Sequence, residues 1–318
     1  MKHAIAAFLS RHYGLEVQEI DRMSTGVGGD TFRVDTASGK YVFKIVKANA
    51  INHPEQEAAL CRFLRDQGIP ASEFMPNRQG SLTTPWDVHR VCHLQHFVDG
   101  RNFPMNTAPD WFIAESPLLL GRVHRALAAY PTLPEGIGAG FFTHMTPDAA
   151  IQSYDRSLTL ARERGEEDVA HSLLLRMKAA ERIRSWRIDP SRLTCRNSRG
   201  DYTVNQILCK DGQVRAIIDW TSACVHPVVW ELVRSYFYAA PECRDGGFDE
   251  ARLATQVAAY TSVAPLNAYD LAHLMDVYLY QLAVCDYYSQ YLHAAPQERA
   301  EFRQQADFAT RVLQRALL

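Results

Sequence analysis

Two carboxylates lie on either side of a short predicted β-hairpin, and their placement suits chemistry on a phosphate group. Asp201 comes just before the hairpin, and Asp219 stands at its exit. Because a hairpin folds back on itself, both acids are expected at the same end of it. In phosphoryl transfer one carboxylate accepts the proton of an attacking hydroxyl, another holds Mg²⁺ against the phosphates, and a side-chain amide completes the metal site. The pair therefore predicts phosphoryl transfer; two acids that merely cap turns are the weaker interpretation.

The apolar pattern predicts the elements that carry these acids. Asp211-Gly212 lies between two apolar segments, and an Asp-Gly pair in that setting is a strong signal for a hairpin turn. The N-terminal part of the chain is predicted to be rich in strands. In order, its expected elements are a helix over 4–13 that ends at Gly14, a glycine-rich turn over 25–30, strands over 31–34 and 41–46, a helix over 53–67 and a strand segment over 88–98.

Beyond residue 98 the pattern becomes mostly helical, because apolar residues recur at helical spacing. The predicted helices cover residues 111–129, 146–164, 168–187, 227–238, 248–261, 268–292 and 297–317. We therefore expect an α+β protein with two lobes. A β-rich domain is expected over residues 1–98 and a mainly helical domain over residues 99–318.

These residues resemble the aminoglycoside phosphotransferase and choline kinase-like family, which has the protein-kinase fold. The catalytic loop of that family reads His-x-Asp with an Asn at the fifth position after the Asp, then an apolar strand, a turn and Ile-Asp-Trp or Ile-Asp-Phe. Asp201 and Ile218-Asp219-Trp220 match this pattern, and Glu231 stands where the family often has an Asp that braces the loop. The matching segments keep the family's order over about residues 20–238, and it is this ordered set that makes the resemblance specific.

The resemblance also implies a nucleotide-binding set in the N-terminal lobe. Lys44 resembles the strand lysine that grips the α- and β-phosphates of ATP, Glu57 resembles the helix glutamate that pairs with it, and residues 94–100 resemble the hinge whose backbone binds adenine. By themselves, hairpin glycines need no ligand, and a lone strand lysine is most often solvated. The implied ATP-binding residues are Gly26, Gly28, Gly29, Lys44, Glu57, Gln95, His96 and Phe97.

Two positions depart from the family's pattern. Arg199 stands where the family has His, and Gln206 stands where it has Asn, while Asn205 lies one residue earlier. Gln keeps the amide oxygen that a metal ion needs but carries it one methylene farther out. The resemblance therefore implies that Asp201 is the catalytic base in the C-terminal lobe, and that Gln206 and Asp219 hold Mg²⁺.

Composition narrows the class of partner. The 318 residues contain 34 Lys and Arg against 36 Asp and Glu, so no bulk charge favours nucleic acid. The seven cysteines include no Cys-x-x-Cys pair, which favours a reducing, cytoplasmic compartment over a disulfide scaffold. No apolar run approaches the roughly 18 residues of a membrane span, so no membrane partner is expected.

We therefore predict an ATP- and Mg²⁺-dependent kinase that phosphorylates a hydroxyl group of a small molecule. Amino sugars, aminoglycoside-like compounds and amino alcohols are acceptors that fit the resemblance. Arg199 and Gln206 raise one alternative, a nucleotide-binding pseudokinase with a regulatory or scaffold role. A Ser/Thr protein kinase of the same fold is a further alternative, which is disfavoured because no Asp-Phe-Gly to Ala-Pro-Glu activation segment follows Asp219.

Overall fold

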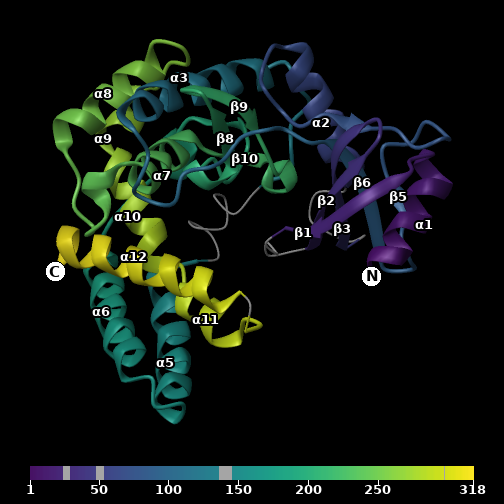
Figure 1. Cartoon of the computed structure of the whole chain (residues 1–318). Coiled ribbons are helices and arrows are strands. Elements are labelled where there is room, and N and C mark those ends of the chain that lie inside the picture. Colours follow the sequence, from purple (N-terminus) through teal and green to yellow (C-terminus); the bar gives the residue numbers. More distant parts are fainter. Residues whose placement is uncertain (24–28, 48–53, 136–144, 297) are drawn as a thin grey trace. The chain divides into compact units, whose positions relative to one another are not determined.

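The computed structural model describes residues 1–23, 29–47, 54–135, 145–296 and 298–318 (Figure 1). Contacts between residues divide the chain into two units. The N-terminal unit comprises Met1–Asn102 together with Gln206–Ala223, and the C-terminal unit comprises Phe103–Asn205 together with Cys224–Leu318.

The N-terminal unit is built on an antiparallel sheet. Its strands follow the order β1-β2-β3-β6-β4, and β5 also pairs with β6. One face of the sheet is apolar, and Phe43 and Ile45 share a buried core with Ile5 and Leu9 of helix α1. The strands are β1 (Val17–Arg22), β2 (Gly29–Thr36), β3 (Gly39–Lys47), β4 (Phe74–Met75), β5 (Thr84–Pro85) and β6 (Arg90–His96), and the helices are α1 (Lys2–Tyr13) and α2 (Pro54–Asp66).

Strand β3 determines which way Lys44 faces. Along this strand the buried residues Tyr41, Phe43 and Ile45 alternate with the half-buried residues Val42 and Lys44. Successive side chains of a strand point to opposite faces of its sheet. Lys44 therefore lies on the face turned away from the apolar core, where a polar ligand can be bound.

The hairpin that separates Asp201 from Asp219 belongs to the N-terminal unit. Strands β8 (Ile207–Lys210) and β9 (Gln213–Ile217) pair in antiparallel fashion. They are joined by Asp211 and Gly212, whose φ angles of 52° and 73° confirm the predicted Asp-Gly turn. Two backbone hydrogen bonds join this hairpin to the rest of the N-terminal unit: the amide of Cys209 donates to the carbonyl of Arg101 at 2.8 Å, and the amide of Ile217 donates to that of Pro70 at 2.6 Å. The unit is therefore formed from two separate segments of the chain.

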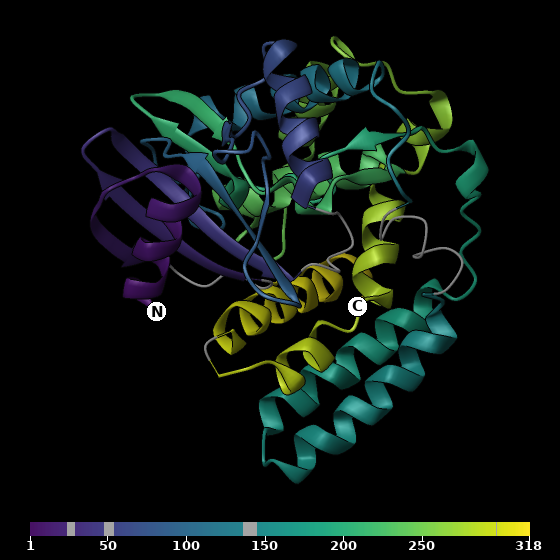
Figure 2. The ribbon, with the colours of Figure 1, turned by 90° about the vertical axis from the view of Figure 1, so that its right-hand side faces the viewer.

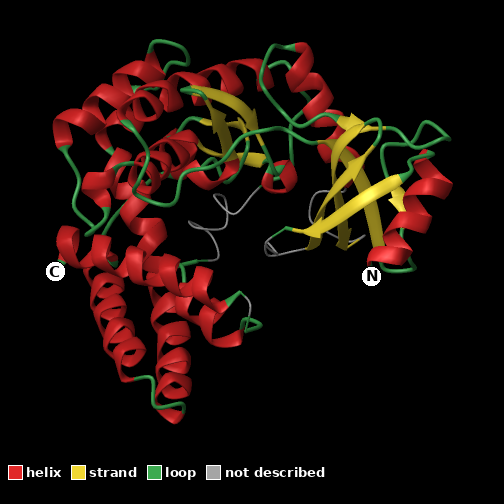
Figure 3. Ribbon diagram, viewed as in Figure 1, coloured by secondary structure: helices red, strands yellow, loops and turns green. Residues whose placement is uncertain are grey.

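The C-terminal unit is mainly helical (Figure 3). Two short strands, β7 (Cys195–Ser198) and β10 (Cys224–Pro227), pair with each other ahead of helix α7 (Val228–Ala239). Every residue of α7 is buried. The other helices are α3 (Asp110–Leu127), α5 (Pro147–Glu163), α6 (Glu167–Ile183), α8 (Glu250–Thr261), α9 (Ala268–Ala272), α10 (Leu274–Val284), α11 (Tyr287–His293) and α12 (Arg299–Leu317).

The prediction of one long helix over residues 268–292 is wrong, because the segment forms the three helices α9, α10 and α11. The fully buried guanidinium of Arg176 donates to the carbonyls of Leu282 and Cys285, each at 2.5 Å. The Asp286 carboxylate accepts from the Ser289 amide and so caps the start of α11. These bonds satisfy backbone groups that a helix end leaves open, so the chain can turn between α10 and α11.

The long helices of the C-terminal unit pack side by side. Figure 2 shows α5 and α6 as an antiparallel pair, with α11 and α12 against them. Among the described residues, no helix has both the length and the apolar character needed to cross a bilayer.

Candidate active site

Lys44 and Asp219 approach each other within the N-terminal unit. The Nζ atom of Lys44 lies 3.9 Å from Oδ1 of Asp219, and the two side chains are 17% and 38% exposed. Lys44 comes from the middle of β3, while Asp219 lies two residues after the end of β9. Tertiary folding therefore brings together the predicted phosphate-binding lysine and the predicted metal-binding acid.

Asp219 has an unusual backbone conformation. Its φ of 58° and ψ of 67° are left-handed, which costs a non-glycine residue about 1–3 kcal/mol and is concentrated at functional sites. The Thr221 hydroxyl donates to its Oδ1 atom at 2.7 Å. The carboxylate is thus fixed and remains partly open to solvent.

Gln206, the second predicted metal ligand, is half-buried immediately before β8. Its backbone carbonyl accepts from the amide of Ile218 at 2.9 Å, so the chain enters the hairpin beside the residue that precedes Asp219. Mg²⁺ prefers oxygen ligands and uses one or two carboxylates with substrate phosphates, rather than an all-protein cage. A partly exposed carboxylate and an amide oxygen fit that requirement.

Glu57 contacts the same segment from helix α2. Its side chain is buried, and Oε1 accepts from the Trp220 amide at 3.0 Å. The bond fixes Glu57 against the residue that follows Asp219. The pairing of Glu57 with Lys44 that the resemblance implies stays a prediction.

The glycine-rich turn is only partly described. Gly26 and Gly28 lie outside the described residues. Gly29 begins β2, where a Cβ atom would lie 2.6 Å from the Ile45 carbonyl oxygen. Close packing of β2 on β3 therefore accounts for Gly29 without a ligand.

The predicted hinge covers the end of β6 and the residue after it. Gln95 is buried, and its Nε2 atom lies 3.3 Å from Nδ1 of His93. The amides of His96 and Phe97 donate to the carbonyls of Glu73 and Lys40 at 2.9 and 3.0 Å. These two amides therefore already donate within the protein, and the role of this segment as an adenine-binding hinge stays a prediction.

Asp201, the predicted base, belongs to the C-terminal unit and is held by two arginines. Arg199, which stands where the family pattern has His, is one of them. It donates to the backbone carbonyl of Asp201 at 2.6 Å and lies 3.3 Å from the Oδ2 atom of the Asp201 carboxylate. Arg234 of α7 donates to Oδ1 of the same carboxylate. Sequence reasoning missed Arg234, and its position three residues after Glu231 on a helix is the only local signal for it.

A buried polar network supports the loop that carries Asp201. Glu231 is fully buried, and its Oε1 atom accepts from the Tyr202 amide at 2.9 Å. Its Oε2 atom accepts from the Ser198 hydroxyl and lies 3.3 Å from Nε2 of both His124 and His226. The predicted bracing role of Glu231 is confirmed by these contacts.

The two histidines of this network differ in their pKa values. Burial alone lowers the pKa of His226, but Glu231 raises it to about 9. Burial opposes ionisation of Glu231, yet His226 and His124 hold its pKa well below the usual value. Burial lowers the pKa of His124 despite the nearby carboxylate. At neutral pH the network therefore contains a buried ion pair between His226 and Glu231 beside a neutral His124.

Replacing Glu231 by Gln is expected to destabilise the protein by about 3–5 kcal/mol, because it leaves the buried His226 charge without its counter-ion. Urea unfolding followed by circular dichroism measures the loss. Glu163→Gln, at an exposed position on α5, is the control and should change stability by less than about 0.5 kcal/mol. Equal effects of the two substitutions would remove Glu231 from the bracing network.

Stability is also expected to fall as the pH rises from about 6.5 to 8. The pKa of His226 is about 9 in the folded protein, against an ordinary value of 6.5, so its contribution is complete below pH 6.5 and declines as the pH approaches 9. The expected loss over this interval is about 1–2 kcal/mol. Urea unfolding at several pH values should show the slope in the wild type and a flatter profile in His226→Gln; identical slopes would contradict the assignment.

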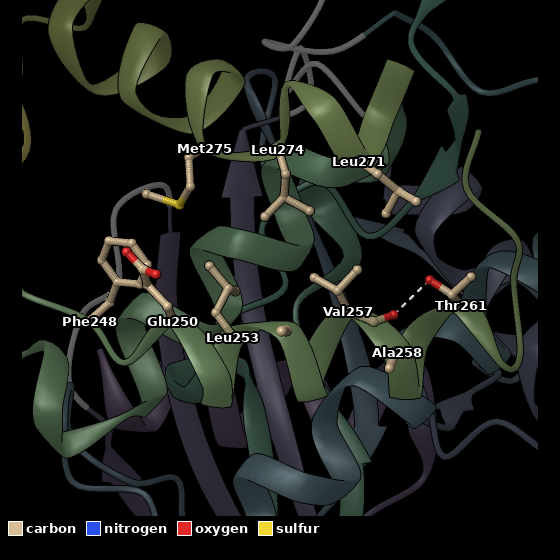
Figure 4. Close-up of a pocket in the computed structure, with 10 residues that line it drawn as sticks. Phe248, Glu250, Leu253, Val257, Ala258, Thr261, Leu271, Leu274 and Met275 are labelled. Atoms are coloured by element: carbon tan, nitrogen blue, oxygen red, sulfur yellow. Dashed lines mark hydrogen bonds between the residues drawn. The ribbon is translucent and has the colours of Figure 1, made fainter. Parts of the chain in front are cut away.

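A separate apolar pocket lies between α8 and the helices α9 and α10 (Figure 4). Its volume is about 570 Å³, and Figure 4 shows Leu271, Leu274 and Met275 pointing toward Leu253 and Val257. The remaining lining residues are Phe248, Glu250, Ala254, Ala258 and Thr261. The pocket includes no predicted site residue, so it is distinct from the candidate active site.

Solved structures similar to this chain share its fold at low sequence identity. A spectinomycin phosphotransferase bound to ADP and spectinomycin matches with a TM-score of 0.61 and 14% identity, over 96% of this chain and 97% of that chain. An amicoumacin kinase solved with AMP-PNP and Ca²⁺ matches with a TM-score of 0.66 and 12% identity, over 96% and 93%. A microcompartment-associated aminopropanol kinase matches with a TM-score of 0.65 and 15% identity, over 99% and 97%.

These matches confirm the predicted kinase-like α+β fold, with a β-rich N-terminal and a helical C-terminal region. No curated protein sequence matches the chain with significance. A family model does match, over residues 19–266, and it describes the phosphotransferase enzyme family. The match covers most of the chain and includes both Asp201 and Asp219. The chain therefore belongs to the phosphotransferase enzyme family.

Proposed function

We propose that this phosphotransferase uses ATP and Mg²⁺ to transfer the γ-phosphate to a hydroxyl group of a small molecule. The observation that carries the proposal is the approach of Lys44 to Asp219, at 3.9 Å, on a left-handed backbone. A lysine beside a partly exposed carboxylate suits a nucleotide phosphate with its metal ion, since the lysine offsets phosphate charge and the carboxylate can bind the cation.

Each residue then has a distinct task. Lys44 neutralises the α- and β-phosphates, with Glu57 setting its position, and Asp219 and Gln206 hold Mg²⁺. Bound Mg²⁺ supplies positive charge that offsets the negative charge of the phosphates during transfer. Asp201 orients the acceptor hydroxyl and accepts its proton.

The acceptor class is proposed from the similar structures. Spectinomycin and hygromycin B occupy two of the similar phosphotransferase structures, and another similar enzyme is an aminopropanol kinase. Amino sugars, aminoglycoside-like compounds and amino alcohols are therefore the acceptors to test first. We also propose that the protein works in a reducing, cytoplasmic compartment, because its seven cysteines are free thiols.

A pseudokinase that binds nucleotide without turnover is the second candidate, favoured by Arg199 and Gln206 at positions where the family pattern has His and Asn. A thermal-shift assay with ATP, with and without Mg²⁺, tests nucleotide binding. A screen of ADP release over amino sugars, aminoglycosides and amino alcohols tests transfer. Binding without turnover on any acceptor would favour the pseudokinase, and no binding would exclude both candidates.

The side-chain amides of Asn205 and Gln206 provide a sharper test of the metal site. Both residues belong to a short 3₁₀ helix, Val204–Gln206, in which Gln206 immediately precedes β8 and Asn205 lies one residue earlier. We expect Gln206→Ala to raise the Mg²⁺ concentration needed for half-maximal turnover at least about tenfold, which corresponds to the loss of one ligand to a charged centre. Asn205→Ala should change it little, and Gln206→Asn should be tolerated. A magnesium titration that ranks the two alanine variants in the opposite order would move the ligand to Asn205.

A further inference from the structure

Two buried arginines contact the carboxylate of Asp201 within the C-terminal unit. Arg234 donates from Nη1 to Oδ1, and the Nη1 atom of Arg199 lies 3.3 Å from Oδ2. Arg199 and Arg234 are only 1% and 7% exposed, whereas the Asp201 side chain keeps 31% of its surface open. The carboxylate is therefore held at both oxygens while part of the Asp201 side chain stays exposed.

Helix α7 holds two successive residues of the catalytic loop. Glu231 accepts from the backbone amide of Tyr202 at 2.9 Å, and Arg234 donates to the side chain of Asp201. Residues three apart lie on the same face of a helix, so one buried face of α7 makes both contacts. The loop backbone and the Asp201 side chain are consequently fixed by the same rigid element.

Aromatic rings stabilise the Arg234 guanidinium in this buried position. Its Cζ atom lies 4.5 Å from the centre of the Tyr238 ring and 5.4 Å from that of Trp230. Such cation–π contacts are strongest where water is excluded. Burial alone lowers the pKa of Arg234, but the Asp201 carboxylate raises it well above the ordinary value. The guanidinium is therefore charged and oriented before any ligand binds.

We propose that Arg234 is a positioning residue for Asp201: it holds Oδ1, with Arg199 beside Oδ2, so that the remaining lone pairs of the carboxylate face the acceptor hydroxyl. The inference rests on the proposed role of Asp201 as the base. An ionised carboxylate has about four lone-pair sites, so contacts to two arginines leave room for the acceptor. A carboxylate held in advance needs no reorganisation when the acceptor arrives, which is what accurate placement contributes to rate.

Arg234→Met and Arg234→Lys test this role. The methionine variant should lower kcat by about 100-fold, the cost of a misplaced reacting group, while the KM for ATP changes less than about twofold. The lysine variant keeps the charge but not the fork of the guanidinium, so it should recover about tenfold of the loss. A kcat within about twofold of wild type in Arg234→Met, or a KM for ATP that rises as much as kcat falls, would overturn the proposal.

Arg176→Met is the matched control for loss of a buried guanidinium. Arg176 is fully buried in the same unit but donates to Tyr154 and to the carbonyls of Leu282 and Cys285, with no contact to Asp201. This variant should lower the melting temperature and leave kcat per folded molecule within about twofold of wild type. A loss of kcat as large as that in Arg234→Met would mean that any buried arginine matters equally, and would overturn the specific role.

A double-mutant cycle on stability tests the contact without requiring an acceptor. Asp201→Asn should lower the urea midpoint of the wild type, because Arg234 loses its counter-ion, and should lower it less than half as much in the Arg234→Met background. Arg234→Lys replaces Arg234→Met in the cycle if the latter does not fold. Additive effects would overturn the proposal. A coupled cycle in a protein that transfers phosphate to no acceptor would keep the contact and reject the proposed function.

Discussion

Asp201→Asn is expected to lower phosphate transfer by about 10²–10⁴-fold, the range that general base catalysis supplies. An asparagine can still orient a hydroxyl, but it cannot accept its proton. Nucleotide binding should remain nearly intact, because Lys44, Asp219 and Gln206 belong to the N-terminal unit and Asp201 belongs to the C-terminal unit. ADP release at saturating acceptor measures the first effect, and the ATP-induced thermal shift measures the second.

Asp211→Asn is the control for this substitution. Asp211 is exposed at the tip of the β8–β9 hairpin with a φ of 52°, a conformation that Asn adopts as readily as Asp. Its turnover should equal that of the wild type. Retention of more than a tenth of the wild-type kcat in Asp201→Asn would exclude Asp201 as the base.

The second large effect is expected at the metal ligand. Asp219→Asn should weaken ATP binding by about 10–100-fold in the presence of Mg²⁺, the cost of losing a charged contact, and change it little in EDTA. The left-handed φ of 58° should survive, because asparagine tolerates this region as well as aspartate does. Isothermal titration with and without Mg²⁺ separates loss of the metal from loss of the fold.

Lys44→Ala should give a different pattern from Asp219→Asn. Lys44 is proposed to contact the phosphates directly, so its removal should weaken ATP binding both with Mg²⁺ and in EDTA. Lys40→Ala is the control, since Lys40 lies on the same strand but its side chain is 59% exposed. If Asp201→Asn and Asp219→Asn reduced nucleotide affinity equally, the division of roles between the two acids would be wrong.

Local sequence patterns predicted most of the helices and the hairpins β2–β3 and β8–β9. Helix α1 ends at Gly14, whose φ is 72°, and the Asp211-Gly212 turn has the left-handed angles that its residues favour. Such signals depend on a few neighbouring residues, so they can be read without the fold. Strand β1 was not predicted, because Val17–Arg22 is a charged edge strand with a single buried residue and shows no clear alternation.

For the candidate site, too, some features could be predicted from the sequence and others could not. The sequence by itself assigned candidate roles to Lys44, Asp201 and Asp219, because their order along the chain resembles that of a kinase-like family, and these roles stay predictions. The sequence also placed Gln206 at the position where the family pattern has Asn. None of these inferences required a contact between distant residues.

Only the tertiary structure decided which groups surround the two acids. Lys44 meets Asp219 although β3 and the hairpin are far apart in the chain, and Arg234 of α7 binds Asp201 although no sequence rule pairs them. The break after α10 depends likewise on Arg176, which donates to its last carbonyls from another helix. The partner of a guanidinium or ammonium group depends on how whole elements pack together. Propensity, turn chemistry and periodicity act over only a few residues, so they do not predict such contacts.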